Sequence, residues 1–476
     1  MIVKLVNRAF SESGMSKTQF AKELGIAKSF ILRVLNGEKP LSQNMLDGIL
    51  SIKNISIETK TALKEEYEKL SFGAKNYEDV QYLIKLINGF DESINRRDSV
   101  YVREEILEKV LFGNQFNFCV NSESELYEIV SFFVKRGLYK SESRFYSNFS
   151  FSQKMLSSLL FTLFYERDFN VGFDFCHIVN IKNDDIHTIL NNVFEALKWS
   201  ELCFNTLGAS AENHPIGAIF PYYIITDEVV IIFNEDCSKA TIFNDKSTVD
   251  FYADYFSRIK LQYSPLLDFH IDEFECLNSN VLSKYNLQTS IDGALCVMQF
   301  TDVEILDKVV PNQIPQREFL IHSALNYFQS TFNKNPVQYL SKDSLSKFAE
   351  DGDLRLISPK NFYPVPIDFR KKLFENMKPG LNNIYVMNSE KISPYKEMDI
   401  HIFDKKLSIM LYPTNKKSPY YSIYYEILFE KNRALEIVFK NMAKLLNNSD
   451  YVYGKEFLNE TVEKMILKCS FSDDSI

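Results

Sequence analysis

Histidines and cysteines are the residues of this chain best suited to metal binding and nucleophilic chemistry, but their spacing favours neither. The seven cysteines are scattered without a CxxC pair, and the six histidines include no pair at the spacing of helical metal ligands. Cys176 and His177 are neighbours, yet adjacent side chains on a strand point to opposite faces, so we expect a buried core pair. The sequence therefore predicts no metal site and no cofactor.

Carboxylates could act as general acids and bases, but their clusters lie beside Asn or Gly in expected turns. The clusters are Asp184-Asp185, Glu235-Asp236 and Asp351 to Asp353, and such positions favour solvated loops. The chain has no HExxH, no GxSxG, no kinase motif set and no phosphate-binding glycine loop. We therefore predict that the protein is not an enzyme.

Basic side chains, in contrast, gather at the beginning of the chain. The first 40 residues hold seven basic and three acidic side chains, a charge of +4, whereas the whole chain carries −9, which leaves −13 for the rest. The basic residues are Lys4, Arg8, Lys17, Lys22, Lys28, Arg33 and Lys39. Because phosphate neutralisation supplies most non-specific affinity for DNA, a small basic segment on an acidic body is typical of a localised DNA footprint.

The basic segment also has the pattern of short helices joined by tight turns. Apolar residues recur at helical spacing from Ile2 to Phe10, and Ser13-Gly14 ends that helix. Ser16 can cap a second helix, with Gln19 three residues later to complete a capping box. Gly25 then supplies the turn that ends it.

A third helix is expected from Ala27 to Leu35, followed by a stop at Asn36-Gly37. Ile31 and Val34 would be buried, while the basic and polar residues project outward. Two helices joined by a glycine turn, with an exposed basic second helix, are the geometry that reads a DNA major groove.

The run SKTQFAKELGIAKSFILRVLNGEKPLS, residues 16–42, resembles the helix-turn-helix of the lambda repressor and Cro type, the XRE family. The matching positions are spread over the motif: Ser16, Phe20-Ala21, Leu24-Gly25-Ile26, Ser29, Ile31, Arg33 and Asn36-Gly37. The resemblance implies an all-α domain of five helices over residues 1–71, with its last two helices at 43–52 and about 57–70.

The resemblance also implies which residues meet DNA. Base edges would be contacted by Lys28, Ser29, Leu32 and Arg33, with Arg33 or Lys28 suited to guanine and Leu32 to a thymine methyl group. The remaining DNA-binding residues, expected mainly at the sugar-phosphate backbone, are Ser16, Lys17, Thr18, Asn36 and Lys39.

Two positions depart from the family pattern. Lys17 stands where many members have Gln, and Leu32 stands where a small polar residue is common. A lysine still contacts phosphate, but it lacks bidentate readout of a base. Two alternative roles stay open, because Asn36 could serve only as a helix cap and Arg33 could serve only as a partner of Glu38.

One such domain buries too little surface to select a site in a genome. The resemblance therefore implies a homodimer that binds a pseudo-palindromic operator in double-stranded DNA.

A chain of 476 residues exceeds the size of one hydrophobic core, so we expect a multidomain protein. After a polar linker at Phe72 to Asn76, residues 77–200 have mostly helical spacing and are predicted to connect or dimerise. No 34-residue tetratricopeptide period is visible. Short β-rich runs then predict an α+β region composed of an α/β module at 201–310 and another at 311–476.

The two α/β modules could be an internal duplication. A β-meander at 222–243 leads into a helix from about Asp245, and a hairpin at 399–412, a strand at 420–429 and a helix to about Leu446 follow the same succession. Residues 242–259 and 428–445 align without gaps. Two such modules could leave a ligand pocket between them, although hairpin-then-helix patterns also resemble one another by default.

Together these observations favour a DNA-binding transcriptional regulator, with repression the commoner habit of the family. Its large C-terminal region, 311–476 above all, would sense a small-molecule or peptide effector. The alternative is a DNA-binding antitoxin-like or defence-related protein whose C-terminal region is a protein-interaction or cryptic catalytic module. A toxin or nuclease gene beside this one would favour the alternative.

The expected location is the cytoplasm. The N-terminus lacks the apolar stretch of a secretory signal, and the odd number of scattered cysteines fits reduced thiols. The longest apolar stretch, around 155–165, is shorter than the ~18 residues needed to cross a bilayer, so no membrane partner is expected.

Overall fold

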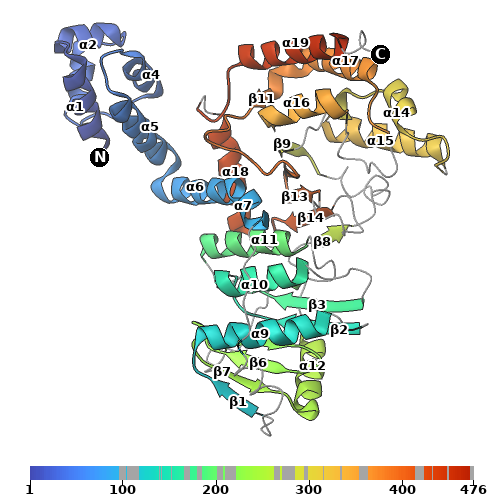
Figure 1. Ribbon diagram of the computed structural model, residues 1–476. Coiled ribbons are helices and arrows are strands. Elements are labelled where there is room, and N and C mark those ends of the chain that lie inside the picture. The colour runs from blue at the N-terminus through green and yellow to red at the C-terminus, as the bar shows by residue number, and fades with distance from the viewer. Residues whose placement is uncertain are drawn as a thin grey trace. The chain divides into compact units, whose positions relative to one another are not determined.

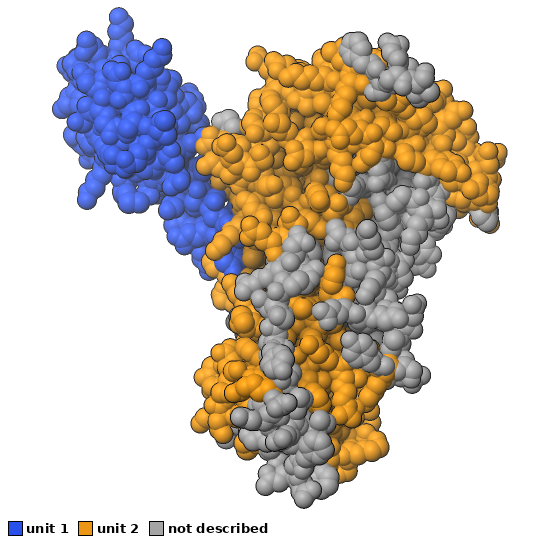
Figure 2. Space-filling view, viewed as in Figure 1, with its two compact units in different colours: residues 1–82 blue, residues 83–476 orange. Residues whose placement is uncertain are grey.

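The computed structural model separates into two compact units, Met1–Tyr82 and Leu83–Ile476 (Figure 2). The residues it describes are 1–95, 103, 117–138, 140, 142–151, 153–165, 172–179, 185–200, 207–208, 221–261, 268–270, 285–293, 298–314, 316–332, 335–352, 363–412, 423–430, 432–447 and 450–471. Cys203, Cys276, Cys296, His214, Asp184 and Asp353 lie outside these residues. No helix of the described chain combines the length and apolar character that a bilayer span requires.

The first unit is helical, as the sequence predicts (Figure 1). Its helices are α1 (Ile2–Ser13), α2 (Lys17–Glu23), α3 (Lys28–Leu35), α4 (Gln43–Ser51), α5 (Ile57–Phe72) and the beginning of α6 (Ala74–Asn88). One apolar core joins α1 to α5, with Phe20, Ile31, Ile49 and Leu63 fully buried. The predicted linker at 72–76 is wrong, because only Gly73 interrupts the helices there, with a φ of 80° that glycine tolerates.

Glu12 ties the first helix of this unit to the beginning of α5. Its carboxylate accepts hydrogen bonds from the Ser56 backbone N–H at 2.9 Å and from the hydroxyls of Ser56 and Thr59 at 2.8 and 2.7 Å. Arg8 donates to the same carboxylate at 2.9 Å. These donors lower the pKa of Glu12 to about 2, because they favour its charged form.

The second unit contains two mixed sheets. Among the described residues, the strands of the first are β1 (Asn117–Val120), β2 (Glu142–Ser147), β3 (Gly172–Ile178), β4 (Leu207–Gly208), β5 (Tyr222–Ile225), β6 (Val230–Phe233) and β7 (Ala240–Phe243). Their order is β1-β7-β6-β5-β2-β3-β4, with β2, β3 and β4 parallel and the other neighbours antiparallel. The accompanying helices are α7 (Phe90–Asn95), α9 (Glu123–Leu138), α10 (Lys154–Tyr165), α11 (Ile186–Ser200) and α12 (Lys246–Lys260).

The strands of the second sheet, again among the described residues, are β8 (Asp268–His270), β9 (Leu287–Asp292), β10 (Val337–Leu340), β11 (Ile384–Val386), β12 (Met398–Phe403), β13 (Lys406–Leu411) and β14 (Ile423–Leu428). Their order is β11-β10-β9-β12-β13-β14-β8. Its helical segments are η2 (Met298–Phe300), α14 (Val303–Val309), α15 (Arg317–Phe332), α16 (Lys342–Asp351), α17 (Ile367–Met377), η3 (Lys378–Asn383), α18 (Arg433–Leu446) and α19 (Lys455–Phe471).

The two sheets have the same topology. Strands β8, β14, β13, β12, β9, β10 and β11 occupy the positions of β1, β7, β6, β5, β2, β3 and β4, with the same parallel and antiparallel neighbours. The expected pair of similar α/β modules is therefore present, as a first module that begins at β1 and a second that begins at β8. The predicted boundaries are wrong, because residues 77–200 contribute three strands to the first sheet and are not only a helical connection.

The β5–β6 and β12–β13 hairpins, together with the pairing of the strands, define which residues of the two modules correspond. Ile224 pairs with Ile231 and then Ile242 across the first sheet, and His401 pairs with Ser408 and then Glu426 across the second. Ile242 therefore corresponds to Glu426, whereas the caps of the following helices make Asp245 correspond to Asn432. The gap-free alignment of 242–259 with 428–445 is thus out of register by two residues in the strand and by one in the helix.

Helices cover both faces of the first sheet. On one face Phe145 and Phe175 contact Phe164 of α10, and Phe175 contacts Trp199 of α11. On the other face Tyr146 stacks on Phe256 of α12, with ring centroids 4.5 Å apart. The α12 face also carries charge.

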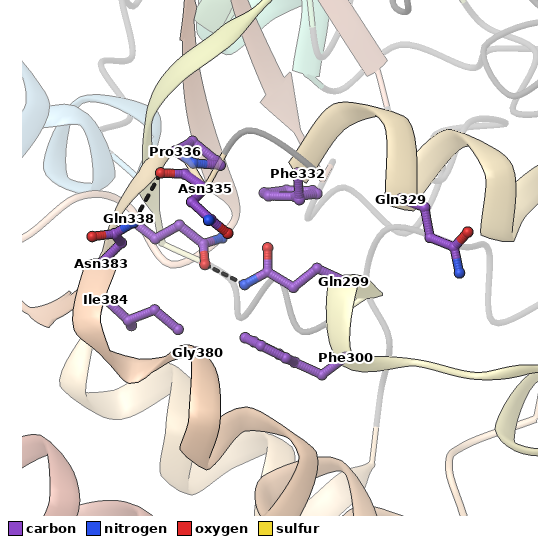
Figure 3. A pocket seen from close by; sticks show the side chains of 10 residues that line it. All are labelled: Gln299, Phe300, Gln329, Phe332, Asn335, Pro336, Gln338, Gly380, Asn383 and Ile384. Atoms are coloured by element: carbon purple, nitrogen blue, oxygen red, sulfur yellow. Dashed lines mark hydrogen bonds between the residues drawn. The ribbon is translucent and has the colours of Figure 1, made fainter.

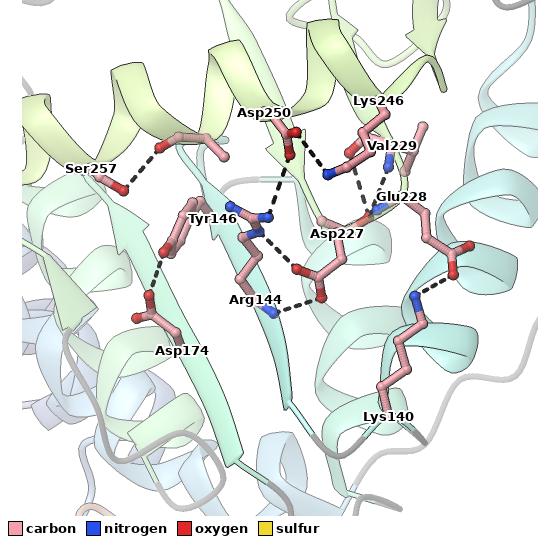
Figure 4. A network of polar contacts seen from close by, with 12 residues as sticks. Lys140, Arg144, Tyr146, Asp174, Asp227, Glu228, Val229, Lys246, Asp250 and Ser257 are labelled. Atoms are coloured by element: carbon pink, nitrogen blue, oxygen red, sulfur yellow. Dashed lines mark hydrogen bonds and ion pairs between the residues drawn. The ribbon is translucent and has the colours of Figure 1, made fainter.

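Figure 4 shows these charged contacts on the α12 face. Arg144 donates to Asp227 in the β5–β6 turn at 2.7 Å and lies 3.9 Å from Asp250 of α12. Asp250 in turn accepts from Lys246 at 2.7 Å, and Tyr146 donates to Asp174. Of these contacts, the one between Arg144 and Asp250 joins α12 to the sheet, and a part-exposed ion pair of this kind adds little stability.

Candidate nucleic-acid interface

The segment expected to meet DNA begins with a capped helix. The Ser16 hydroxyl accepts the backbone N–H of Gln19 at 3.3 Å, and the Gln19 side chain accepts the backbone N–H of Ser16 at 3.0 Å. The predicted capping box is confirmed. Lys17 and Thr18, which follow it, are both exposed.

A glycine turn joins α2 to α3. Gly25 adopts a φ of 65°, its N–H donates to the Lys22 carbonyl at 3.1 Å, and the Ile26 N–H donates to the Ala21 carbonyl at 2.9 Å. This pair of bonds is a Schellman motif, which needs a left-handed residue at the glycine position. The close approach of α4 is equally dependent on glycine, since a Cβ atom on Gly48 would lie 2.7 Å from Leu24. The sequence thus sets the angle at which α3 leaves α2.

Helix α3 has one buried and one exposed side. Ile31, Val34 and Leu35 lie in the core, whereas Lys28, Ser29 and Arg33 are exposed and Leu32 is half-buried. Residues at i, i+1, i+4 and i+5 share one side of a helix, so the four residues expected to contact base edges lie together. Their exposure leaves these side chains accessible to a DNA groove.

The end of α3 brings its expected DNA contacts close to an acidic residue. Asn36 is the C-cap of α3, and its side-chain amide donates to Glu38 at 3.2 Å. Arg33 lies 3.6 Å from the same carboxylate, with about half of each side chain exposed. Both alternative roles named above are thus seen in the free protein: Asn36 caps the helix and Arg33 pairs with Glu38. An exposed pair of this kind is weak and leaves Arg33 able to exchange partners.

The turn after α3 positions Lys39. Gly37 has a φ of 78°, and the Glu38 N–H donates to the Arg33 carbonyl at 2.8 Å. A Cβ atom on Gly37 would lie 3.2 Å from a Val3 methyl group, so this turn also packs against α1. Lys39 follows this turn and is exposed.

One residue of the exposed surface was missed by the sequence analysis. Phe30, in the first turn of α3, keeps 37% of its surface exposed although the neighbouring Ile31 is fully buried. It follows Lys28 and Ser29 in the sequence and lies at the edge of the side that these residues share with Arg33, which makes it a further candidate for contact with a thymine methyl group. The sequence signal for Phe30 is a large apolar residue that lies outside the helical spacing of the buried positions of a short helix.

The second module contains a buried Ser, Asp and His, which are the residue types of a catalytic triad but are not arranged as one. The Ser290 hydroxyl donates to Asp292 at 3.1 Å, and His401 Nε2 lies 3.6 Å from the same carboxyl group. Ser290 thus bonds to the acid and not to the base, and both Ser290 and Asp292 are fully buried. Burial raises the pKa of Asp292, against the opposing effect of His401. Among the described residues, no group of three or more His, Cys, Asp or Glu side chains could hold a metal ion.

Comparisons with known proteins add little to this description. No family model and no curated protein matches the chain. Among solved structures, the crystal structure of phosphatidylserine synthase from Haemophilus influenzae Rd KW20 is similar over 82% of this chain and 98% of its own, with 9% identity and a TM-score of 0.24. A similarity this low carries no conclusion about function, so the interface rests on the residues of this chain.

Proposed function

We propose that this protein is a sequence-specific DNA-binding transcriptional regulator of the XRE type, most simply a repressor, that places α3 in the major groove. The observation that carries the proposal is the exposed side of α3, where Lys28, Ser29 and Arg33 project from a helix whose opposite side is buried. The glycine turn before α3 holds it at a defined angle to α2. That combination is the geometry of a groove-reading helix.

The contacts divide by chemistry. Arg33 can offer a bidentate pair of donors to guanine, Lys28 a point charge to guanine or phosphate, and Ser29 a hydroxyl to either class of acceptor. Leu32 and Phe30 supply apolar surface for thymine methyl groups. The remaining predicted contacts, Ser16, Lys17, Thr18, Asn36 and Lys39, would hold the domain on the sugar-phosphate backbone.

A single copy of this unit offers too few base contacts for selection among genomic sites. We therefore propose that the functional form is a homodimer on a pseudo-palindromic operator, with the second unit of the chain as the effector-sensing part. An effector changes DNA affinity only to the extent that it binds the two states of the dimer unequally.

The test is DNA binding by the full chain across a salt series, with DNA upstream of its own gene and with sequences selected from a random double-stranded library. We expect a selected half-site repeated as a pseudo-palindrome, and an affinity that falls with salt by a slope of about −0.9 per phosphate contact. Lys28→Ala/Arg33→Ala should lose discrimination between the selected and scrambled sequences.

A matched control keeps net charge constant between variants. Lys53 and Lys75 are exposed residues of the same unit outside the basic segment of residues 1–40, so Lys53→Ala/Lys75→Ala removes the same charge. The control should retain sequence discrimination. If the two double variants behave alike, or if no sequence is enriched from the library, α3 does not read DNA and the proposal fails.

Glu38 offers a gain-of-affinity variant. Its carboxylate holds Arg33 and Asn36 in the free protein and would lie near phosphates in the complex. Glu38→Gln should therefore tighten operator binding a few-fold, because an exposed ion pair of roughly 0.2–1 kcal/mol no longer competes for Arg33. Unchanged or weaker binding in titrations of labelled operator would show that Arg33 does not move to DNA.

A further inference from the structure

A cavity of about 330 Å³ lies in the second module, at the beginning of β10 (Figure 3). Its walls come from four separate parts of the chain: η2, the end of α15 with the residues that follow it, β10, and η3 with the beginning of β11. The volume falls within the range of small-molecule sites. The cavity lies inside one module and not at the junction where the sequence analysis placed a pocket.

The lining is rich in side-chain amides and, among the residues that the structure describes, has no ionisable group. The amide residues are Gln299, Gln329, Asn335, Gln338 and Asn383. Phe300, Phe332, Pro336, Ile384 and Gly380 complete the wall. A charged ligand would find no counter-charge among these described residues, which therefore favour a neutral molecule.

Three of the five amides make hydrogen bonds to other parts of the wall, and Figure 3 draws these bonds as dashed lines. Gln299 donates its side-chain N–H to the Gln338 carbonyl oxygen, and Asn383 donates to the Asn335 backbone carbonyl at 3.0 Å. Neighbouring elements thus fix the directions of these amide groups before any ligand binds. Fixed polar groups lower the entropic cost of binding.

One hydrogen-bond donor in the wall has no partner. Gln338 is 2% exposed, and its side-chain nitrogen is buried without a hydrogen bond among the described residues. A buried amide N–H without an acceptor costs free energy. The presence of this N–H in the wall therefore calls for an acceptor that comes from a ligand. A ligand in the cavity that Gln338 lines would satisfy it.

We propose that this cavity binds an uncharged nucleobase or nucleoside. Asn and Gln amides pair with the adjacent donors and acceptors of a base edge, and the rings of Phe300 and Phe332 offer apolar faces for a flat heterocycle. The Gln338 nitrogen donates to a ring nitrogen or carbonyl oxygen of the base. The role of this ligand as an effector rests on the proposed regulator function. Binding of the ligand is measured without DNA and is therefore tested separately.

The experiment is calorimetric titration of the full chain with adenine, guanine, cytosine and uracil and their nucleosides, beside AMP, inorganic phosphate and glucose. We expect one base class to bind with a stoichiometry of one per chain, as the base and as the nucleoside, and AMP to bind more weakly. Saturation by none of the bases or nucleosides, or tighter binding of AMP, phosphate or glucose, would overturn the proposal.

The variant that tests the site is Gln338→Leu, with Gln288→Leu as its matched control. Gln288 is an exposed glutamine on the adjacent strand β9 and does not line the cavity. Gln338→Leu should weaken ligand binding at least tenfold, whereas Gln288→Leu should leave it unchanged. Equal affinity in the two variants would contradict the role of Gln338.

Protein stability separates a binding role from a structural one. Gln338→Leu removes a buried donor without a partner, but it also removes the oxygen that accepts from Gln299, so the ligand-free variant should melt close to the wild-type temperature. Gly380→Ala alters the cavity from another element, since a Cβ atom there would lie 2.9 Å from the Phe300 ring. It should also weaken binding, and full affinity in both cavity variants would place the ligand elsewhere.

Discussion

The two modules of the second unit share a strand order but differ in what their sheets bury. In the first module the register row runs from His177 through Ser147 to Ile224, Ile231 and Ile242. The corresponding row of the second module is Gln338, Ser290, His401, Ser408 and Glu426. The three antiparallel strands thus carry isoleucines in the first row, whereas every position of the second row, called the polar row below, is polar.

The polar row is accompanied by a buried ion pair. Lys406 is fully buried, contacts the Glu426 carboxylate, and lies 5.0 Å from the ring centres of Tyr285 and of Phe403. The register and the hairpin place Val229 of the first module at the position of Lys406. Hydrogen bonding and pairing make such burial tolerable, but apolar packing would be as stable or more so. The comparison teaches that the polar face of the second module is not required by the fold.

The largest expected effect comes from breaking the buried ion pair. Lys406→Met leaves Glu426 buried without its cation and should destabilise the second module by about 3–5 kcal/mol. Lys406→Met/Glu426→Leu, which makes both positions apolar as in the first module, should recover most of that loss. Urea-dependent hydrogen exchange of β13 and β14 measures both, with peptides of the first sheet as the internal control.

The double variant decides between two interpretations. If it is as unstable as the single variant, the polar face is needed for folding and the two modules are not interchangeable at these positions. Recovery would instead support polar residues retained for a role other than stability.

The next effect is a pH dependence of the first module. Burial lowers the pKa of His177 to about 3, whereas an unfolded histidine titrates near 6.5. The unfolded state therefore takes up the proton first, and stability should fall as pH drops from about 6.5 towards 3, by at most about 1.4 kcal/mol per pH unit. Hydrogen exchange of β2 and β3 at several pH values measures the slope.

His177→Gln places in the first module the residue that the second module has at the corresponding position. Gln does not titrate and can still bond to Ser147, whose hydroxyl lies 2.7 Å from His177 Nδ1. The stability of the variant should therefore fall less steeply with decreasing pH. The fall in stability that other titrating groups cause should remain. Identical slopes in the two proteins would show that His177 does not titrate in this way.

The smallest effect expected is a pH dependence of the opposite sign in the second module. Burial raises the pKa of Asp292, so the folded state holds its proton more tightly than the unfolded state does. Stability should therefore decline as pH rises from the ordinary aspartate pKa through the raised value. His401 faces this carboxyl group and reduces the effect.

Asp292→Asn preserves an acceptor for Ser290 and removes the titration. The variant should flatten the decline of the β9 and β12 hydrogen-exchange stability with rising pH. A steeper decline in the variant would mean that Asp292 is ionised in the fold and paired with a protonated His401.

Local signals made the first unit predictable from its sequence. Ser16 with Gln19, Gly25 and Gly37 act through bonds within a few residues, so the helix ends follow from residue types alone. The β-meander at 222–243 was also predicted, because hairpin strands pair with near neighbours.

The strands that the sequence analysis missed pair with distant residues. β9 contains Gln288, Ser290 and Asp292, a composition typical of a loop, and becomes a central strand only because β10 and β12 lie on either side of it. β2 and β3 pair in parallel across an intervening helix, so no turn signal marks them.

The sequence by itself determined the helices of the first unit, the basic surface of α3 and the repeated succession of hairpin and helix. Tertiary structure alone decided the shared strand order of the two modules, the buried polar row and the amide-lined cavity. The physical reason is range: caps, turns and amphipathic spacing act over a few residues, whereas the cavity joins side chains from Gln299 to Ile384 through pairing and packing between distant segments.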